Sequence, residues 1–264
     1  MKLILSIIGI VICFSVHRLL GTLALALVTL FLVLNYFPGV LAILGNSKFS
    51  EGDIEKALKL YKKAASWGTA SEKIKTTYAV LLLRSGEPQK ATEMFNKVVL
   101  NGSAKKEERL YAKQYRCMSY YKSGNLEDAI EDAKEVYEAG KSTQIYSILG
   151  FLMTVSKESP EDILAFCEEA YEFNSDDRDI IDNLVVALTN VGNLERARDL
   201  AEGLTKNQPQ FVEGFYHLAL IYKKMGDVEN MKKAILGLKG TKRSYMTTVS
   251  ECDVDKLISE AENA

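Results

Sequence analysis

The first 44 residues are almost entirely apolar, whereas the rest of the chain mixes apolar and polar positions. Residues 3–16 form one apolar run, which ends at His17 and Arg18, and residues 19–44 form a second run without any charge. A helix needs about 20 apolar residues to cross a bilayer core of about 30 Å. The second run meets this length, and the first reaches it only if the Arg18 side chain extends toward the membrane surface. The pattern therefore predicts a transmembrane anchor in residues 1–44.

Three arrangements of this anchor fit the pattern. The favoured one is a helical hairpin that crosses the membrane through residues 3–20, turns near Gly21 and returns through residues 23–44. The second is a single span within residues 19–44, preceded by a peripheral segment. The third is a cleaved signal peptide. The lack of a small-residue A-x-A cleavage site after the first run argues against it.

Lysines indicate the side on which the remainder of the chain lies. A hairpin places both chain ends on one side of the membrane. Lys2 lies at one end, and five lysines follow the second run: Lys48, Lys56, Lys59, Lys62 and Lys63. The turn offers only Arg18 and His17 against them. Because positive charge is enriched on the cytoplasmic side, we expect an integral membrane protein whose remaining residues face the cytoplasm.

After residue 44, apolar residues recur at i, i+3, i+4 and i+7, the stripe of amphipathic helices. A glycine-led phrase, GDIEKALKLYKKA at residues 52–64, returns in altered form along the chain. Its glycines are Gly52, Gly86, Gly124, Gly192 and Gly226. The first two and the last two are 34 residues apart, and the interval from Gly124 to Gly192 holds two periods with a degenerate copy inside. This period predicts a solenoid of stacked helical hairpins, with glycine allowing a positive φ in each turn.

The 34-residue period resembles the tetratricopeptide repeat family. That family places small residues at position 8 of the first helix and position 20 of the second, and position 20 is alanine at Ala57, Ala91, Ala129 and Ala197. The resemblance covers residues 38–240 and implies an all-α solenoid of about six hairpins. The expected repeats are 38–71, 72–105, 110–142, 143–176, 178–211 and 212–240, followed by a capping segment at 241–264.

Each end of the predicted solenoid has two interpretations. The first repeat begins inside the second apolar run, so the membrane helix could continue into it with a bend at Pro38 and Gly39. The alternative is a helix break at residues 37–39. At the far end, Asp253 or Asp255 would start a short helix that caps the last repeat. The alternative there is a recognition tail.

Composition and charge exclude several classes of function. The formal net charge is −2, and residues 45–264 carry 31 basic against 35 acidic residues, a balance that argues against nucleic-acid binding. The four cysteines form no CxxC pair, and the two histidines have no partner at ligand spacing, so we predict no metal and no cofactor. Nucleotide-binding and catalytic motifs are missing. We therefore expect neither an enzyme nor a small-molecule substrate.

The resemblance implies that a protein or peptide partner binds the concave wall, which the first helices of the repeats line. Carried onto this chain, the family's wall positions predict these residues: Val80, Leu83, Arg84, Tyr111, Gln114, Tyr115, Met118, Tyr121, Ile148, Phe151, Asp182, Asn183, His217 and Lys224. The alternative hypothesis is that these side chains only pack between neighbouring helices or against the C-terminal segment.

The expected function is a membrane-anchored scaffold or adaptor that binds a protein or peptide in the concave groove and contacts lipid through residues 1–44. The alternative is a structural or assembly subunit of a membrane protein complex. Some members of the family clamp the C-terminal carboxylate of heat-shock chaperones with paired Lys and Asn side chains. Asn46 matches one clamp position, but Ala42 stands where the lysine belongs, so this form of binding is not expected.

Overall fold

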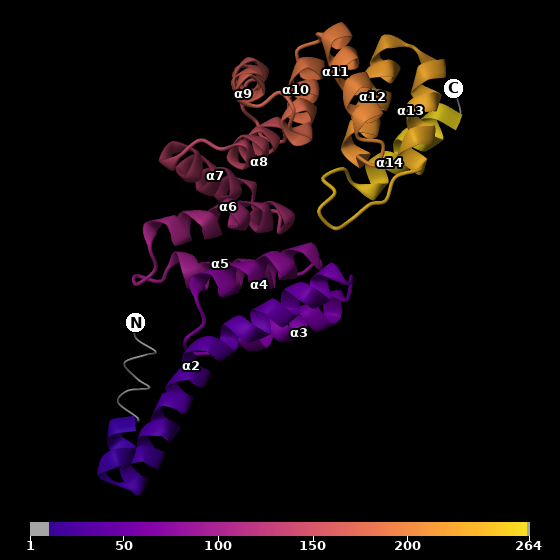
Figure 1. The fold of residues 1–264 in the computed structure, drawn as a ribbon. Coiled ribbons are helices and arrows are strands. Elements are labelled where there is room, and N and C mark those ends of the chain that lie inside the picture. The colour runs from indigo at the N-terminus through magenta and orange to yellow at the C-terminus, as the bar shows by residue number, and fades with distance from the viewer. Residues whose placement is uncertain (1–10, 263–264) are drawn as a thin grey trace.

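The computed structural model describes residues 11–262, and the regular structure in that range is entirely α-helical. After a helical segment at residues 11–16, the helices are α2 (Arg18–Ser50), α3 (Ile54–Ala65), α4 (Glu72–Arg84), α5 (Pro88–Val99), α6 (Lys106–Lys122), α7 (Leu126–Ala139), α8 (Thr143–Thr154), α9 (Pro160–Phe173), α10 (Arg178–Asn190), α11 (Leu194–Asn207), α12 (Val212–Met225), α13 (Val228–Lys239) and α14 (Glu251–Glu262). Successive pairs stack into a curved solenoid, from which the N-terminal half of α2 projects (Figure 1). The predicted all-helical solenoid is confirmed.

Glycine makes the turn within most of the helix pairs. Gly52, Gly86, Gly124, Gly192 and Gly226 have φ between +75° and +84°, the left-handed region that a Cβ atom disfavours. This confirms the role that the spacing predicted for them. The turn between α8 and α9 has no such glycine and is longer; there the Ser156 hydroxyl accepts a hydrogen bond from the Glu158 amide at 3.1 Å.

Small residues let the two helices of a pair approach closely. Ala57, Ala91, Ala129 and Ala197 are fully buried. In the first pair, a Cβ atom on Gly45 would lie 2.7 Å from the Tyr61 ring. The Tyr61 hydroxyl donates to Asn46 Oδ1 at 2.7 Å, which holds this amide inside the first repeat. Asn46 therefore supports packing within the first repeat.

A buried ion pair within the third helix pair is also hydrogen-bonded to the second pair. Arg116 on α6 and Asp132 on α7 are only 8% and 4% exposed. The guanidinium donates from Nε and Nη2 to the two carboxylate oxygens, each at 2.7 Å, and from Nη1 to Asn96 Oδ1 of α5 at 2.6 Å. This two-point geometry fixes the orientation of both side chains. Three consecutive helices are thereby held by one polar cluster.

Helix α2 runs unbroken from the apolar segment into the first repeat, so the alternative of a break at residues 37–39 is wrong. Pro38 has no N–H group, which leaves the Leu34 carbonyl without its usual donor. Trp67 Nε1 donates to that carbonyl at 3.1 Å, and the Thr69 hydroxyl donates to it as well. The rings of Trp67 and Phe37 lie 5.0 Å apart. Helix α2 bends in this region (Figure 1), and the loop between α3 and α4 is fastened to the bend.

The N-terminal turn lies earlier than the sequence predicted. The helical segment ends at residue 16, and His17 Nδ1 accepts from the Leu19 amide at 3.2 Å as the N-cap of α2. Gly21, predicted as the turn, lies inside α2, and its missing Cβ leaves room for the Phe14 ring. The predicted passes 3–20 and 23–44 therefore do not match the observed boundaries, because the histidine cap stops the first helix. Residues 3–10 of the first pass lie outside the described range.

The C-terminal segment has two parts. Helix α14 starts after Ser250, whose hydroxyl accepts from the Asp253 amide at 3.1 Å, so the predicted starts at Asp253 and Asp255 are wrong. Its apolar residues Val254, Leu257 and Ala261 are buried against the last helix pair. Residues 241–250, between α13 and α14, cross the concave face; we call them the strap.

A concave groove closed by the strap

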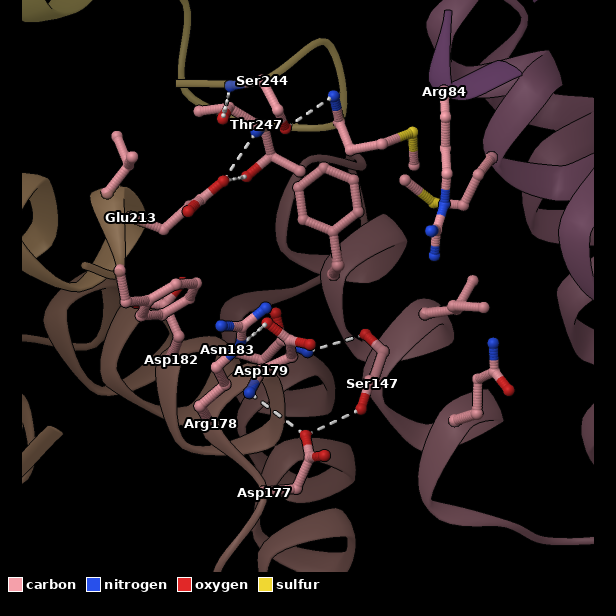
Figure 2. Close-up of a pocket in the computed structure, with 18 of the residues that line it drawn as sticks. Arg84, Ser147, Asp177, Arg178, Asp179, Asp182, Asn183, Glu213, Ser244 and Thr247 are labelled. Carbon is pink, nitrogen blue, oxygen red and sulfur yellow. Dashed lines mark hydrogen bonds and ion pairs between the residues drawn. The ribbon is translucent and has the colours of Figure 1, made fainter. Parts of the chain in front are cut away.

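A cavity of about 740 Å³ lies between the strap and the concave wall of the solenoid. The wall comes from α4, α6, α8, α10 and α12, the first helices of successive pairs, because these helices face the inside of the curve. Figure 2 shows Ser244 and Thr247 of the strap on one side of the cavity and Ser147, Asp177 and Asp179 on the other. Both the solenoid and its C-terminal segment therefore shape the site.

One part of the groove is apolar. Its side chains are contributed by the second, third and fourth helix pairs and by the strap: Val80, Leu83, Tyr115, Met118, Ile148, Phe151 and Met246. Phe151 is held in place by Tyr121, whose ring meets it edge-on at 4.9 Å. Such a surface can receive the apolar side chains of a partner.

The other part of the groove is polar and surrounds the start of α10. Asp177 caps this helix by accepting from the amides of Asp179 and Ile180, both at 3.1 Å, and from the Ser147 hydroxyl at 3.0 Å. Asn183 Nδ2 donates to the Ser147 carbonyl at 2.8 Å (Figure 2). These bonds fix the positions of Asp177 and Asn183, and Asn183 is itself buried between the helices.

Carboxylates outnumber bases on this wall. Burial in the groove raises the pKa of Asp179 to about 6, although half of its side chain is still accessible to solvent. The negative charges of Asp177, Asp182 and Glu213 also raise this pKa, whereas the positive charge of Arg178 lowers it. The Asp182 carboxylate accepts a hydrogen bond from His217 Nδ1 across 2.7 Å. Burial works against the charged imidazole of His217, but the Asp182 carboxylate outweighs it and the pKa of His217 is raised.

Adjacent residues near the end of the strap bind two different helices of the wall. Lys122 of α6 donates to the Thr247 carbonyl at 2.7 Å, and the Thr248 amide donates to Glu213 of α12 at 2.8 Å. Two residues before Thr247, the Tyr245 ring packs over Gly86, and its centroid lies 5.4 Å from the Lys122 amine. Burial lowers the pKa of Lys122, and Glu213 acts in the opposite direction. The strap thus spans from the second helix pair to the last.

The structure brings together nine of the fourteen predicted groove residues. Those that line the cavity are Val80, Leu83, Arg84, Tyr115, Met118, Ile148, Phe151, Asp182 and Asn183. Part of this wall also contacts the C-terminal segment, as the packing hypothesis proposed.

Five predicted residues do not line the cavity. Tyr111 is nearly half exposed, and its ring meets the Tyr115 ring edge-on with centroids 5.2 Å apart, while the Tyr121 ring contacts Phe151. His217 is bound to Asp182, and Lys224 donates to the Thr189 carbonyl at 3.4 Å. The fifth is Gln114. Helix α6 begins at Lys106, four residues before the expected start of its repeat. The family's wall positions therefore did not predict which residues near the N-terminal end of α6 line the cavity.

The cavity is also lined by residues that the sequence did not predict. These are Thr143, Gln144, Ser147, Asp177, Arg178, Gln210, Phe211, Val212 and Glu213 on the helices, and Lys242, Ser244, Met246, Thr247 and Thr248 on the strap. Most of the helical ones lie at the first turns of α8, α10 and α12. The N-cap pattern of Asp177 could have indicated that end of α10. The strap is polar and lacks periodicity, so no local signal places it in the groove.

The side chains that line the site offer non-covalent contacts. Between residues 11 and 262, no three His, Cys, Asp or Glu side chains are arranged to hold a metal ion. Cys167 is buried in the core, and this burial raises the pKa of its thiol to about 12, which keeps it protonated and unreactive. The groove itself offers apolar contacts, hydrogen bonds and an excess of carboxylates.

Comparison with known proteins agrees with the repeat architecture. Sequence profiles described as tetratricopeptide repeat match residues 48–114 and 212–237. The search of curated proteins gave no significant match.

Solved structures with a similar fold are tetratricopeptide repeat proteins or share their shape. A tetratricopeptide repeat protein from Parabacteroides merdae is 14% identical, with a TM-score of 0.63 and 86% of each chain covered. Pseudomonas aeruginosa pilF is 16% identical, with a TM-score of 0.60, 84% of this chain and 97% of that one covered. A thermophilic tetratricopeptide repeat protein of Thermus thermophilus, TTC0263, is 14% identical, with a TM-score of 0.59, 74% of this chain and all of that one covered. The part of the chain that the structure describes is an all-helical solenoid, and tetratricopeptide repeats are detected in two segments of it.

Proposed function

We propose that the chain is a membrane-anchored scaffold whose concave groove binds a protein or peptide partner. Tetratricopeptide repeats generally serve protein–protein interaction. The observation that supports this role is the cavity of about 740 Å³ with an apolar wall at one end and a polar, acidic wall at the other. A peptide with apolar side chains would find contacts at α4, α6 and α8, and its polar or basic groups would find partners at α10 and α12.

The surface of α2 supports the membrane anchor. In the described range, it is the one helix that is long and apolar enough to cross a bilayer. Its apolar side chains are open to the surroundings, with Leu19 72% and Phe31 60% exposed. A continuous apolar surface of this kind marks contact with lipid or with another protein. We infer that the N-terminal part of α2 lies in the membrane and that the repeats face the cytoplasm.

Photo-crosslinking in membranes tests the groove. Benzoylphenylalanine replaces Tyr115 inside the groove or, as the matched control, Phe173 at the end of α9, which is 49% exposed. In cells that express the full chain naturally, position 115 is expected to form a discrete protein adduct and position 173 is not. Adding Phe151→Ala should lower the adduct roughly ten-fold, because an anchor of about 1.4 kcal/mol is lost. Equal adducts at both positions would contradict groove binding.

A structural or assembly subunit of a membrane complex is the second candidate function. The exposed apolar surface of α2 favours it, because the same side chains that contact lipid could contact other transmembrane helices. The two functions differ in the detergent-solubilised particle. A subunit stays in a particle of defined, larger mass through purification, whereas a scaffold releases its groove partner when Phe151→Ala is introduced.

The position of Cys252 offers a test of sidedness. Cys252 is exposed, whereas Cys117 and Cys167 are buried, and burial raises the pKa of both of these thiols. A membrane-impermeant maleimide is therefore expected to label the chain only after the cells are opened, and Cys252→Ser should remove that labelling. Labelling of Cys252 in intact cells would place the repeats on the outer side.

A further inference from the structure

The end of the proposed membrane span coincides with the attachment point of the first repeat. At about 1.5 Å per residue, residues 19–37 extend about 28 Å, close to the bilayer core of about 30 Å. Arg18 precedes this stretch, and Phe37 ends it. The Phe37 ring contacts Trp67, with centroids 5.0 Å apart. The loop between α3 and α4 therefore lies at the level where the hydrocarbon would end.

The aromatic residues at this level have the character of a membrane interface. Trp67 is the only tryptophan in the chain, and its indole lies against α2 while its N–H group binds the Leu34 carbonyl. Tyr36, the residue before Phe37 in α2, is 65% exposed. Tryptophan and tyrosine are enriched where hydrocarbon meets headgroups because they combine an apolar ring with a polar group.

Lys62 and Lys63 lie at the end of α3, just before the loop that carries Trp67. The Lys63 amine is 5.8 Å from the centroid of the Phe37 ring. Earlier lysines of α3 are paired, Lys56 with Asp53 and Lys59 with Glu55. Among the residues that the structure describes, neither Lys62 nor Lys63 forms an ion pair, and both are exposed. Cations in this position attract anionic lipid headgroups.

The bend of α2 continues this surface. Just after Pro38, apolar residues on the first repeat's own helix remain uncovered by the solenoid: Val40 is 49%, Ile43 70% and Leu44 50% exposed. The loop cannot swing away from α2 without breaking the bonds of Trp67 and Thr69 to the Leu34 carbonyl. The apolar side chains, the aromatic rings and the two lysines therefore move as one unit.

We propose that residues 62–69 rest on the bilayer surface and that Lys62 and Lys63 bind anionic lipid headgroups. This inference depends on the proposed membrane anchoring of α2. It assigns the first repeat to the membrane surface and leaves the concave groove for the partner.

The fluorescence of the native Trp67 measures how deeply this side chain lies in the bilayer. The full chain is reconstituted into phosphatidylcholine vesicles that contain brominated lipids, with the bromines either near the headgroup or near the bilayer centre. Trp67 fluorescence is expected to be quenched at least two-fold more by the shallow bromines than by the deep ones. As a control, Trp67→Phe/Tyr171→Trp moves the tryptophan to α9, far from the membrane, where neither lipid should quench it.

Energy transfer from Trp67 to dansyl lipids tests headgroup preference. Transfer to dansyl-phosphatidylglycerol is expected to exceed transfer to dansyl-phosphatidylcholine by at least two-fold, because the anionic lipid gathers around the lysines. Lys62→Gln/Lys63→Gln should abolish this excess. The matched control is Lys232→Gln/Lys233→Gln, which removes the same charge from two adjacent exposed lysines of α13 and should leave the excess unchanged.

Each outcome separates this inference from the anchor on which it depends. If the chain resists alkaline extraction but Trp67 is not quenched, the anchor stands and the surface contact is overturned. Equal transfer to both lipids, or an unchanged excess in Lys62→Gln/Lys63→Gln, overturns the headgroup assignment. A chain that alkali extracts completely from the vesicles overturns both proposals.

Discussion

Asp132→Ala is expected to destabilise the third helix pair by about 3–5 kcal/mol, because it leaves a buried guanidinium without its counter-ion. Arg116 is 8% exposed and makes two of its bonds, each 2.7 Å long, to this carboxylate. Its remaining bond to Asn96 cannot neutralise the charge. Urea unfolding of the detergent-solubilised chain, followed by circular dichroism, measures the loss. Hydrogen exchange should rise mainly in α6 and α7, because a solenoid distributes stability between neighbours.

Two controls separate the unpaired charge from the loss of a side chain. Arg116→Met/Asp132→Leu removes both charges and should recover most of the stability, because apolar residues of similar size can replace a buried pair. Glu229→Ala breaks an exposed ion pair, in which the Glu229 side chain is 80% and the Lys233 side chain 66% exposed. This variant should lose less than about 1 kcal/mol of stability. A loss for Asp132→Ala as small as that for Glu229→Ala would contradict the predicted role of the buried pair.

Lys122→Met/Glu213→Ala is expected to release the strap from the groove. Lys122 donates a hydrogen bond to the Thr247 carbonyl at 2.7 Å, and Glu213 accepts one from the Thr248 amide at 2.8 Å. Hydrogen bonds to charged groups contribute about 1.5–3 kcal/mol each, so losing both should raise the population of the open strap at least ten-fold. Limited trypsin digestion measures this, because Lys242 and Arg243 lie exposed in the strap and are cleaved faster when it opens.

The strap variant has a control of equal charge change. Lys232→Met/Glu229→Ala alters α13 at exposed positions with no bond to the strap and should leave the cleavage rate unchanged. If the strap restricts access to the groove, the crosslinked adduct at position 115 should also increase in Lys122→Met/Glu213→Ala. Equal cleavage of the wild type and this variant would show that other contacts, such as Tyr245 on Gly86, hold the strap.

The repeats could be predicted because their signals are local. The 34-residue spacing of the glycines predicts the turns, and the alanines of the second helices predict the close packing within each pair. In the structure, these glycines have positive φ and these alanines are buried. Most of the apolar groove residues followed from the same register. Helix ends were harder, because a single capping side chain decides them: His17 ends the first segment, and Ser250 starts the last helix.

By itself, the sequence determined an all-helical, repeating solenoid with an apolar N-terminal segment, because periodicity and side-chain size act between near neighbours. Only the tertiary structure decided how α2 passes through Pro38, since the donors that satisfy its free carbonyl lie more than thirty residues away at Trp67 and Thr69. The closed groove likewise exists only in three dimensions. Lys122 and Thr247 are 125 residues apart in the chain, and their contact forms because the curvature of the whole solenoid brings its last segment back across its second and third helix pairs.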